Sequence, residues 1–285
     1  RSVLFMLARM RRMPQMNGVE LLTRVKDLFP ETVRLMLTGN ADQETAMEAV
    51  NSGQIFRFLT KPCPQATLVT SLALALRQYR LITAEKELLQ QTLKGSITVL
   101  AELLGIAHPL AFSGGVRIKK YMIEIAQALE LPGLWQFEIA ALMSQIGCVS
   151  LPGEVLSKVL AGQDLTGDEA AMFAGHPGIG AALLEKIPRL ENVASMIALQ
   201  QIRYDHYTPD LMSAHFEEVL LGAQILKAVI DLDRHLSRGM RQQDALSLMH
   251  KHWGWYNPKI LAILETIKPE VSGQIFSLAV EQLSE

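Results

Sequence analysis

The stretches VRLMLTG (residues 33–39) and FRFLTKP (residues 56–62) decide the fold of the N-terminal third. Each begins as a short, nearly all-apolar run, which is typical of a strand buried on both faces. Helical spacing of apolar residues over 19–29 and 42–51 precedes each run. Helix and strand alternating in this order predict an α/β fold with a parallel sheet, whose ligands bind at the carboxyl ends of the strands.

Together with MPQMNGVELL (residues 13–22), these stretches resemble the second half of a response-regulator receiver domain, which has a flavodoxin-like sheet. The resemblance implies that Thr38 senses a phosphoryl group and that Phe58 changes rotamer with it. It implies further that Lys61 contacts that group directly and that Pro62 follows a cis bond. A hydroxyl donor and an ammonium group that converge on one anion suit phosphate binding. A sensor histidine kinase as partner, and Mg²⁺ in an intact receiver, are implied as well.

The receiver is incomplete in this sequence. Where the family has a phosphate-accepting Asp just before the Met-Pro turn, residues 9–13 read RMRRM, and residues 1–13 contain no acid. Either the receiver is naturally truncated, or the sequence omits segments of a longer chain. We favour the second explanation, with residues 2–5 as a first strand, residues 6–12 as part of a first helix, and chain breaks near Phe5 and near Arg12–Met13. The acceptor Asp would then lie in an omitted segment.

A long helix is predicted after the receiver, because residues 65–93 contain neither Gly nor Pro. Its apolar stripe consists of Leu68, Leu72, Leu76, Tyr79, Leu88 and Leu89. The stripe is compatible with a coiled coil and therefore with a homodimer. The alternative is one amphipathic helix packed within a monomer. We expect a partial receiver over 1–66, a linker helix over 64–96 and an output domain over 97–285.

The remaining sequence predicts an all-α domain. Amphipathic segments alternate with Gly and Pro punctuation, and Pro177 is expected to separate a helix over 167–174 from one over 178–186. The stretches VRIKKYMIEIAQALELP (116–132), FEIAALMSQIGCVSLP (137–152) and MFAGHPGIGAALL (172–184) resemble the HD-GYP branch of the HD-domain phosphohydrolases. The resemblance implies an HD-like helical bundle. Active members hydrolyse cyclic di-GMP at a cluster of two or three metal ions.

The positions that bind metal in that family are mostly replaced here. Ser144-Gln145 stands where the family has His-Asp, and Gln200-Gln201 stands where it has His-His. His176, Arg203 and Asp205 keep their places. Hydroxyl and amide groups are poor substitutes for imidazoles and bridging carboxylates. We therefore expect no catalytic residue, no metal and no cofactor in the output domain.

Composition excludes several other classes of protein. A net charge of -2 provides no basic field for nucleic acid, and 49% apolar residues argue against disorder. No apolar run reaches the ~18 residues that span a bilayer, and two cysteines suit a reducing cytosol.

The sequence thus predicts a cytoplasmic response regulator that binds neither DNA nor membrane. Phosphorylation of its receiver would modulate a degenerate output domain that acts through a protein partner or by binding cyclic di-GMP. An active phosphodiesterase with unusual ligands and a purely structural regulator are the alternatives.

Overall fold

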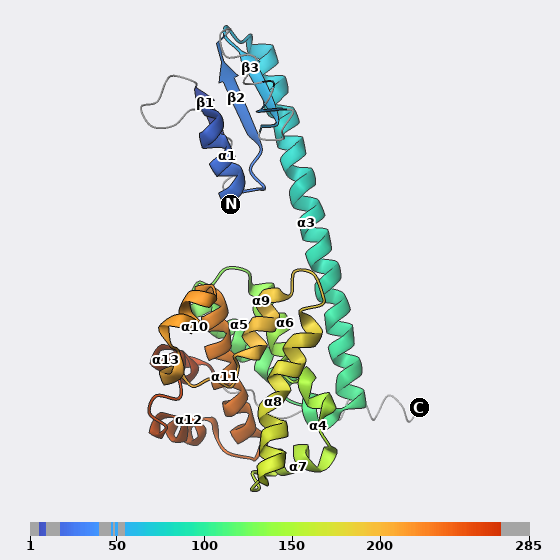
Figure 1. The fold of residues 1–285 in the computed structure, drawn as a ribbon, viewed down its shortest axis with the longest axis vertical. Helices are drawn as coiled ribbons and strands as arrows, with labels where there is room; N and C mark the ends of the chain where they lie inside the picture. The colour runs from blue at the N-terminus through green and yellow to red at the C-terminus, as the bar shows by residue number, and fades with distance from the viewer. Residues whose placement is uncertain (1–5, 10–17, 40–46, 48, 51–54, 269–285) are drawn as a thin grey trace. The chain divides into compact units, whose positions relative to one another are not determined.

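The computed structural model describes residues 6–9, 18–39, 47, 49–50 and 55–268. The chain forms two compact units, Arg1–Leu93 and Lys94–Glu285. The boundary between them falls inside one long helix, α3 (Gln65–Ala107), which belongs partly to each unit (Figure 1). The predicted fold class is confirmed: a small parallel sheet is followed by a mostly helical, HD-like domain, and a long helix joins them.

In the described part of the N-terminal unit, three parallel strands form a sheet in the order β1-β2-β3. Its described elements are β1 (Met6–Arg9), α1 (Gly18–Leu28), β2 (Arg34–Thr38) and β3 (Arg57–Thr60). Met36 packs with Leu22 of α1, whereas Leu35 packs with Ala75 of α3. Both faces of β2 are therefore covered, as its apolar sequence predicts.

The prediction of a helix over 6–12 is wrong for residues 6–9, which form strand β1. Residues 3–8 (VLFMLA) are continuously apolar, and an apolar run this short fits a buried strand as well as a helix. Pairing decides between the two, because Met6 to Arg9 lie in parallel register with Arg34 to Leu37. The predicted chain breaks near Phe5 and Arg12, and most of the helix expected over 42–51, lie outside the described residues.

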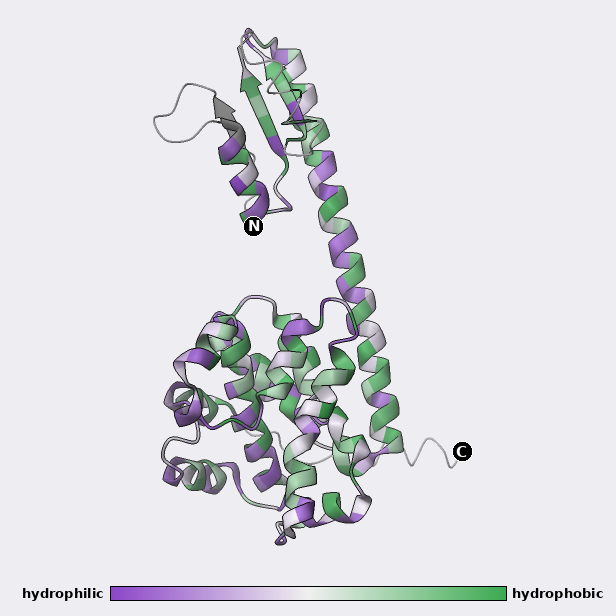
Figure 2. Ribbon diagram, in the orientation of Figure 1, coloured by the Kyte–Doolittle hydropathy of each residue, from purple (hydrophilic) through white to green (hydrophobic). Residues whose placement is uncertain are grey.

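Helix α3 continues from the predicted linker into the predicted output domain, which is expected to begin at residue 97, and forms 43 continuous residues. Hydrophobic and hydrophilic residues alternate along it (Figure 2). Its predicted apolar stripe has two different environments. Leu72 and Tyr79 pack against the sheet cluster of Val33 and Leu35, so this part is not free for dimerisation. Leu88 and Leu89 are exposed.

Helices α4 to α13, together with the last part of α3, form the described part of the second unit. They are α4 (Pro109–Phe112), α5 (Gly115–Ala128), α6 (Leu134–Met143), α7 (Gly153–Ala161), α8 (Gly167–Leu184), α9 (Glu191–Ala198), α10 (Pro209–Ala214), α11 (Glu217–Ser237), α12 (Gln242–Lys251) and α13 (Pro258–Thr266). Two short 3₁₀ helices, η2 (Ile146–Ser150) and η3 (Tyr204–His206), lie between them. Helix α11 is buried along most of its length and packs against α5, α9, α12 and α13 (Figure 1). Among the described helices, none is both long and apolar enough to cross a membrane.

The predicted break at Pro177 is wrong, because α8 runs through it. A proline within a helix removes the amide that would donate to the carbonyl four residues earlier, here Phe173. In α8 that carbonyl oxygen lies 2.5 Å from Nδ1 of His176. The side chain thus replaces the missing backbone donor, and the helix continues to Leu184.

Candidate functional site

The receiver residues singled out in the sequence meet at the carboxyl edge of the sheet. Thr38 and Thr60 are paired at the ends of β2 and β3. The backbone N–H of Lys61 donates to the Thr38 carbonyl oxygen over 2.8 Å, and this bond holds the two predicted phosphoryl-sensing positions together. Thr38 is buried, and the Lys61–Pro62 peptide is cis, as the resemblance implies.

Phe58 lies within β3, before Thr60, and faces the interior. It pairs in register with Met36 and is half-buried against the cluster that contains Leu22 and Ile55. Its ring therefore packs close to Leu22 of α1.

In the second unit, Gln145, His176, Gln200 and Gln201 line one cavity of about 250 Å³. We call it the α8–α11 cavity, because Phe173 and His176 of α8 and Lys227, Asp231 and Arg234 of α11 complete its polar and aromatic lining. Residues from four helix regions therefore converge on this cavity, although most are not metal ligands.

Ser144 lies behind the cavity rather than in its lining. Its hydroxyl donates to the Ala141 carbonyl oxygen over 2.9 Å. Its own carbonyl oxygen accepts a 2.8 Å hydrogen bond from Nε2 of Gln200. Ser144 thus terminates α6 and orients Gln200, and both side chains are buried.

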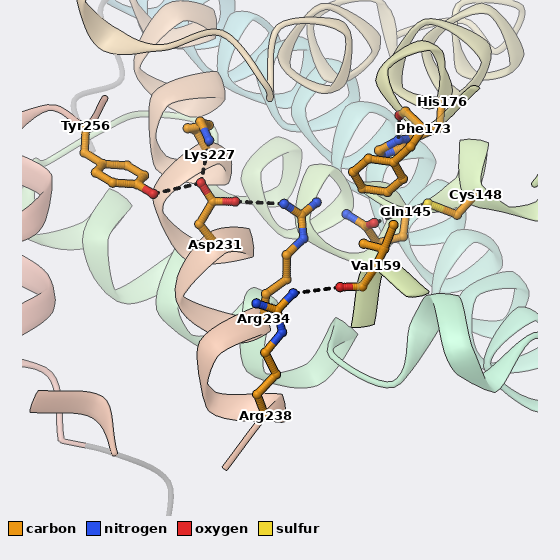
Figure 3. Close-up of polar contacts among 10 residues, drawn as sticks. All are labelled: Gln145, Cys148, Val159, Phe173, His176, Lys227, Asp231, Arg234, Arg238 and Tyr256. Carbon is orange, nitrogen blue, oxygen red and sulfur yellow. Dashed lines mark hydrogen bonds and ion pairs between the residues drawn. The ribbon is translucent and has the colours of Figure 1, made fainter. Parts of the chain in front are cut away.

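Three residues of α11 form an ionic cluster on one helix face. Lys227 and Arg234 flank Asp231 at spacings of four and three residues, and both pair with its carboxylate, Arg234 Nη1 at 2.9 Å. Tyr256 donates its hydroxyl to the same carboxylate over 2.9 Å (Figure 3). Burial alone would raise the pKa of Asp231, but Lys227 and Arg234 outweigh it and hold that pKa below its usual value.

His176 is fully buried, and its imidazole is uncharged near neutral pH. Burial lowers its pKa to about 4, although the hydrogen bond to Phe173 favours the charged form. Because Nδ1 donates to a carbonyl oxygen, the lone pair of the neutral ring is on Nε2. A neutral histidine held in this way is suited to accept a hydrogen bond or to ligate a metal.

Arg203 and Asp205 do not line the α8–α11 cavity. They form a two-point ion pair of 2.7 and 3.1 Å, and the Arg203 guanidinium lies 5.2 Å from the Trp255 ring centroid. Arg203 lines a neighbouring cavity of about 490 Å³, which also includes Gln201. Of the candidate residues, Arg203 therefore lines the second cavity only, and Ser144 and Asp205 line neither of the two.

Sequence reasoning missed Lys227, Arg234 and Tyr256 as members of the site. The pattern of Lys227, Asp231 and Arg234 is visible in the sequence, since residues three and four apart share one face of a helix. The contact of Tyr256 with Asp231 joins segments 25 residues apart, and no local pattern reveals it.

A model of the HD domain matches residues 98–260, more than half of the chain, and a model of the response regulator receiver domain matches residues 11–73. The chain therefore belongs to the HD domain family. Its N-terminal part is a response regulator receiver domain. The chain therefore has the domain arrangement of a response regulator with an HD output domain.

Similarity to individual proteins is partial. The hydrogenase transcriptional regulatory protein HoxA of Bradyrhizobium diazoefficiens is 36% identical over 70 residues, which cover 25% of this chain and 14% of that protein. HoxA of Cupriavidus necator is 39% identical over 51 residues, which cover 18% of this chain and 11% of that protein. The chain thus spans about one seventh or less of the curated relatives it matches.

Two solved structures also share similarity. "Bd1817, a HDG"Y"P protein from Bdellovibrio bacteriovorus" aligns over 62% of each chain with 16% identity and a TM-score of 0.46. An adenylate cyclase structure from Rhodopirellula baltica aligns over 30% of this chain and 62% of that chain, with 46% identity and a TM-score of 0.29.

Proposed function

We propose that this protein is a response regulator whose receiver controls an HD output domain that acts without metal-dependent hydrolysis. The observation that carries the proposal is the cluster on α11. The Asp231 carboxylate, the acidic group of the α8–α11 cavity, already accepts from Lys227, Arg234 and Tyr256.

The donor set of this cavity does not fit a metal cluster. Hydrolytic metal sites use imidazoles and carboxylates that are open to the ion. Here the amides of Gln145, Gln200 and Gln201 surround a single imidazole, and the ammonium and guanidinium groups beside Asp231 would repel a cation. Among the described residues, no three His, Cys, Asp or Glu side chains are grouped so that they could hold an ion.

The receiver supplies the signal in this proposal. A sensor histidine kinase would phosphorylate it, and the phosphoryl group would be sensed at the Thr38 and Lys61 edge, with Phe58 responding. Helix α3 packs on the sheet through Leu72 and Tyr79. Its later part is anchored by Ile97, which is buried, and by Lys94, whose Nζ lies 2.5 Å from Glu138. One helix thus contacts both domains, and it would carry the change to a protein-binding or cyclic di-GMP-binding output.

We propose further that the chain forms a homodimer through α3. Positions 89, 93, 96, 100, 103 and 107 follow the four-three spacing of a coiled-coil seam and carry Leu, Leu, Ser, Leu, Leu and Ala. Leu89, Leu100 and Leu103 are exposed. Replacing Leu100 and Leu103 by Lys should convert a dimer to a monomer in light scattering, whereas Glu102→Lys on the same helix should not. A wild-type monomer would contradict this part.

Metal content and turnover test the main proposal. We expect purified protein supplied with Mn²⁺ or Fe²⁺ to bind less than one tight ion per chain and to leave cyclic di-GMP intact. Two or more tightly bound ions with hydrolysis would instead establish the alternative, an active phosphodiesterase with unusual ligands. A variant with Gln145→Asp and Gln200→His introduces two metal ligands and is the matched gain-of-ligand control for the metal analysis.

A further inference from the structure

Three buried polar atoms in the described part of the chain converge on the α8–α11 cavity without a hydrogen-bond partner. They are Nε2 of Gln145, Nε2 of His176 and Oε1 of Gln200. His176 is 0% exposed and Gln200 is 2% exposed. Buried polar groups in folded proteins normally have a partner, so these atoms point to a ligand in the cavity.

The hydrogen bonds that these side chains do make fix the role of each free atom. Because Nε2 of Gln200 donates to the Ser144 carbonyl, its Oε1 is an acceptor. Because Nδ1 of His176 donates to the Phe173 carbonyl, its Nε2 is also an acceptor. The Oε1 atom of Gln145 accepts from Sγ of Cys148 over 3.4 Å, which leaves Nε2 as a donor.

The α11 side of the cavity carries an excess of positive charge. Lys227 and Arg234 together contribute two positive charges against the single carboxylate of Asp231, and His176 is neutral. The Arg234 guanidinium extends from α11 to a position between Asp231 and Gln145 (Figure 3). Its Cζ lies 5.2 Å from the centroid of the Phe173 ring. A guanidinium beside an amide donor is a favourable place for an oxyanion.

We propose that the α8–α11 cavity binds a small oxyanion that also carries an O–H or N–H donor. The anionic oxygens would contact Arg234, Lys227 and Nε2 of Gln145, and the donor would satisfy His176 or Gln200. A partly protonated phosphate and a hydroxycarboxylate share this chemistry. The inference rests on the proposed function, because it assigns to side-chain cations the place where a hydrolytic relative would hold metal.

Binding to the full chain in the presence of EDTA tests the inference. Inorganic phosphate and lactate are the two probes, and acetate is the matched anion without an O–H donor. We expect saturable heat in calorimetry and a rise in melting temperature with phosphate, lactate or both, and about tenfold weaker binding of acetate. Which of the two binds more tightly identifies the source of the oxyanion.

Gln145→Met is the decisive variant, because it removes a donor that has no partner and retains the length of the side chain. We expect it to weaken binding about tenfold without lowering the melting temperature of the ligand-free protein. Gln163→Met, at an exposed site after α7, should bind like the wild type. Arg234→Gln should abolish binding.

The absence of saturable binding by both probes would overturn the inference, as would unchanged affinity in Gln145→Met. The hydrolysis assay with added metal separates this outcome from failure of the proposed function. Turnover of cyclic di-GMP would refute the proposed function. If the protein shows no turnover and binds no anion, only the inference of an oxyanion site is refuted.

Discussion

The Nδ1 atom of His176 lies 2.5 Å from the carbonyl oxygen of Phe173, the group that Pro177 deprives of its backbone donor. The histidine and the proline that follows it therefore act as a pair within α8. This relationship supplies a structural reason for a buried imidazole that is independent of catalysis, and it leaves Nε2 directed to the α8–α11 cavity.

The pair predicts an energetic coupling. His176→Leu should leave the Phe173 carbonyl unpaired, which costs about 1–3 kcal/mol. Pro177→Ala restores the amide, so the same histidine substitution should cost about 1 kcal/mol less in that background. Urea denaturation of the two single variants and the double variant measures the coupling. The cycle with Pro258→Ala, at the start of α13, is the control, and equal coupling in both cycles would contradict the prediction.

The lowered pKa of His176 predicts a pH-dependent stability. Below pH 6.5 the unfolded chain binds a proton that the folded chain takes up only near pH 4. The free energy of unfolding should therefore fall as the pH drops from 6.5 to 4, by on the order of 3 kcal/mol. His176→Leu should remove this slope. Burial also lowers the pKa of His235, so His235→Gln serves to separate its contribution. An unchanged slope in His176→Leu would refute the assignment.

The α11 cluster predicts that replacing either of two aspartates will have very different effects on the free energy of unfolding. Asp231→Asn leaves Lys227 and Arg234 largely buried without their counter-charge and should lower the free energy of unfolding by about 3–5 kcal/mol. Asp205→Asn breaks a more exposed pair with Arg203 and should cost less than about 1 kcal/mol.

An apolar replacement of the whole cluster is the complementary experiment. Combining Lys227→Met, Asp231→Leu and Arg234→Met should recover most of the stability that Asp231→Asn loses. Similar costs for Asp231→Asn and Asp205→Asn in chemical denaturation would show that the cluster is not an interdependent unit.

Close packing of η2 against α8 predicts a strict requirement for Gly147. A Cβ atom at this position would lie 1.8 Å from the His176 carbonyl oxygen. Gly147→Ala should therefore force the two segments apart, with a loss of about 2 kcal/mol or more. Gly153→Ala, where nothing lies within 4 Å, should change stability by less than about 1 kcal/mol. Comparable melting temperatures for the two variants would contradict this packing.

The sequence was sufficient for strands β2 and β3 and for most of the helical unit, because their apolar spacing is local. It failed at residues 6–9 and at Pro177 for opposite reasons. The first depends on pairing with β2, and the second depends on a side chain that replaces a backbone donor. Neither effect is visible in periodicity.

The candidate site divides in the same way. The family resemblance singles out Gln145, His176 and Gln200, and these three residues line one cavity. The charge of that cavity comes from Lys227 and Arg234, which the sequence presents only as ordinary helix residues. Their importance follows from burial with Asp231, and burial is a property of the folded chain.

The cations that neutralise Asp231 are covalently part of α11. A metal ion is gained or lost as its free concentration in the cell changes, whereas Lys227 and Arg234 are present at a fixed ratio to the carboxylate in every molecule. Metal starvation or chelation therefore leaves the Lys227–Asp231–Arg234 cluster intact, because its cations are made with the polypeptide chain.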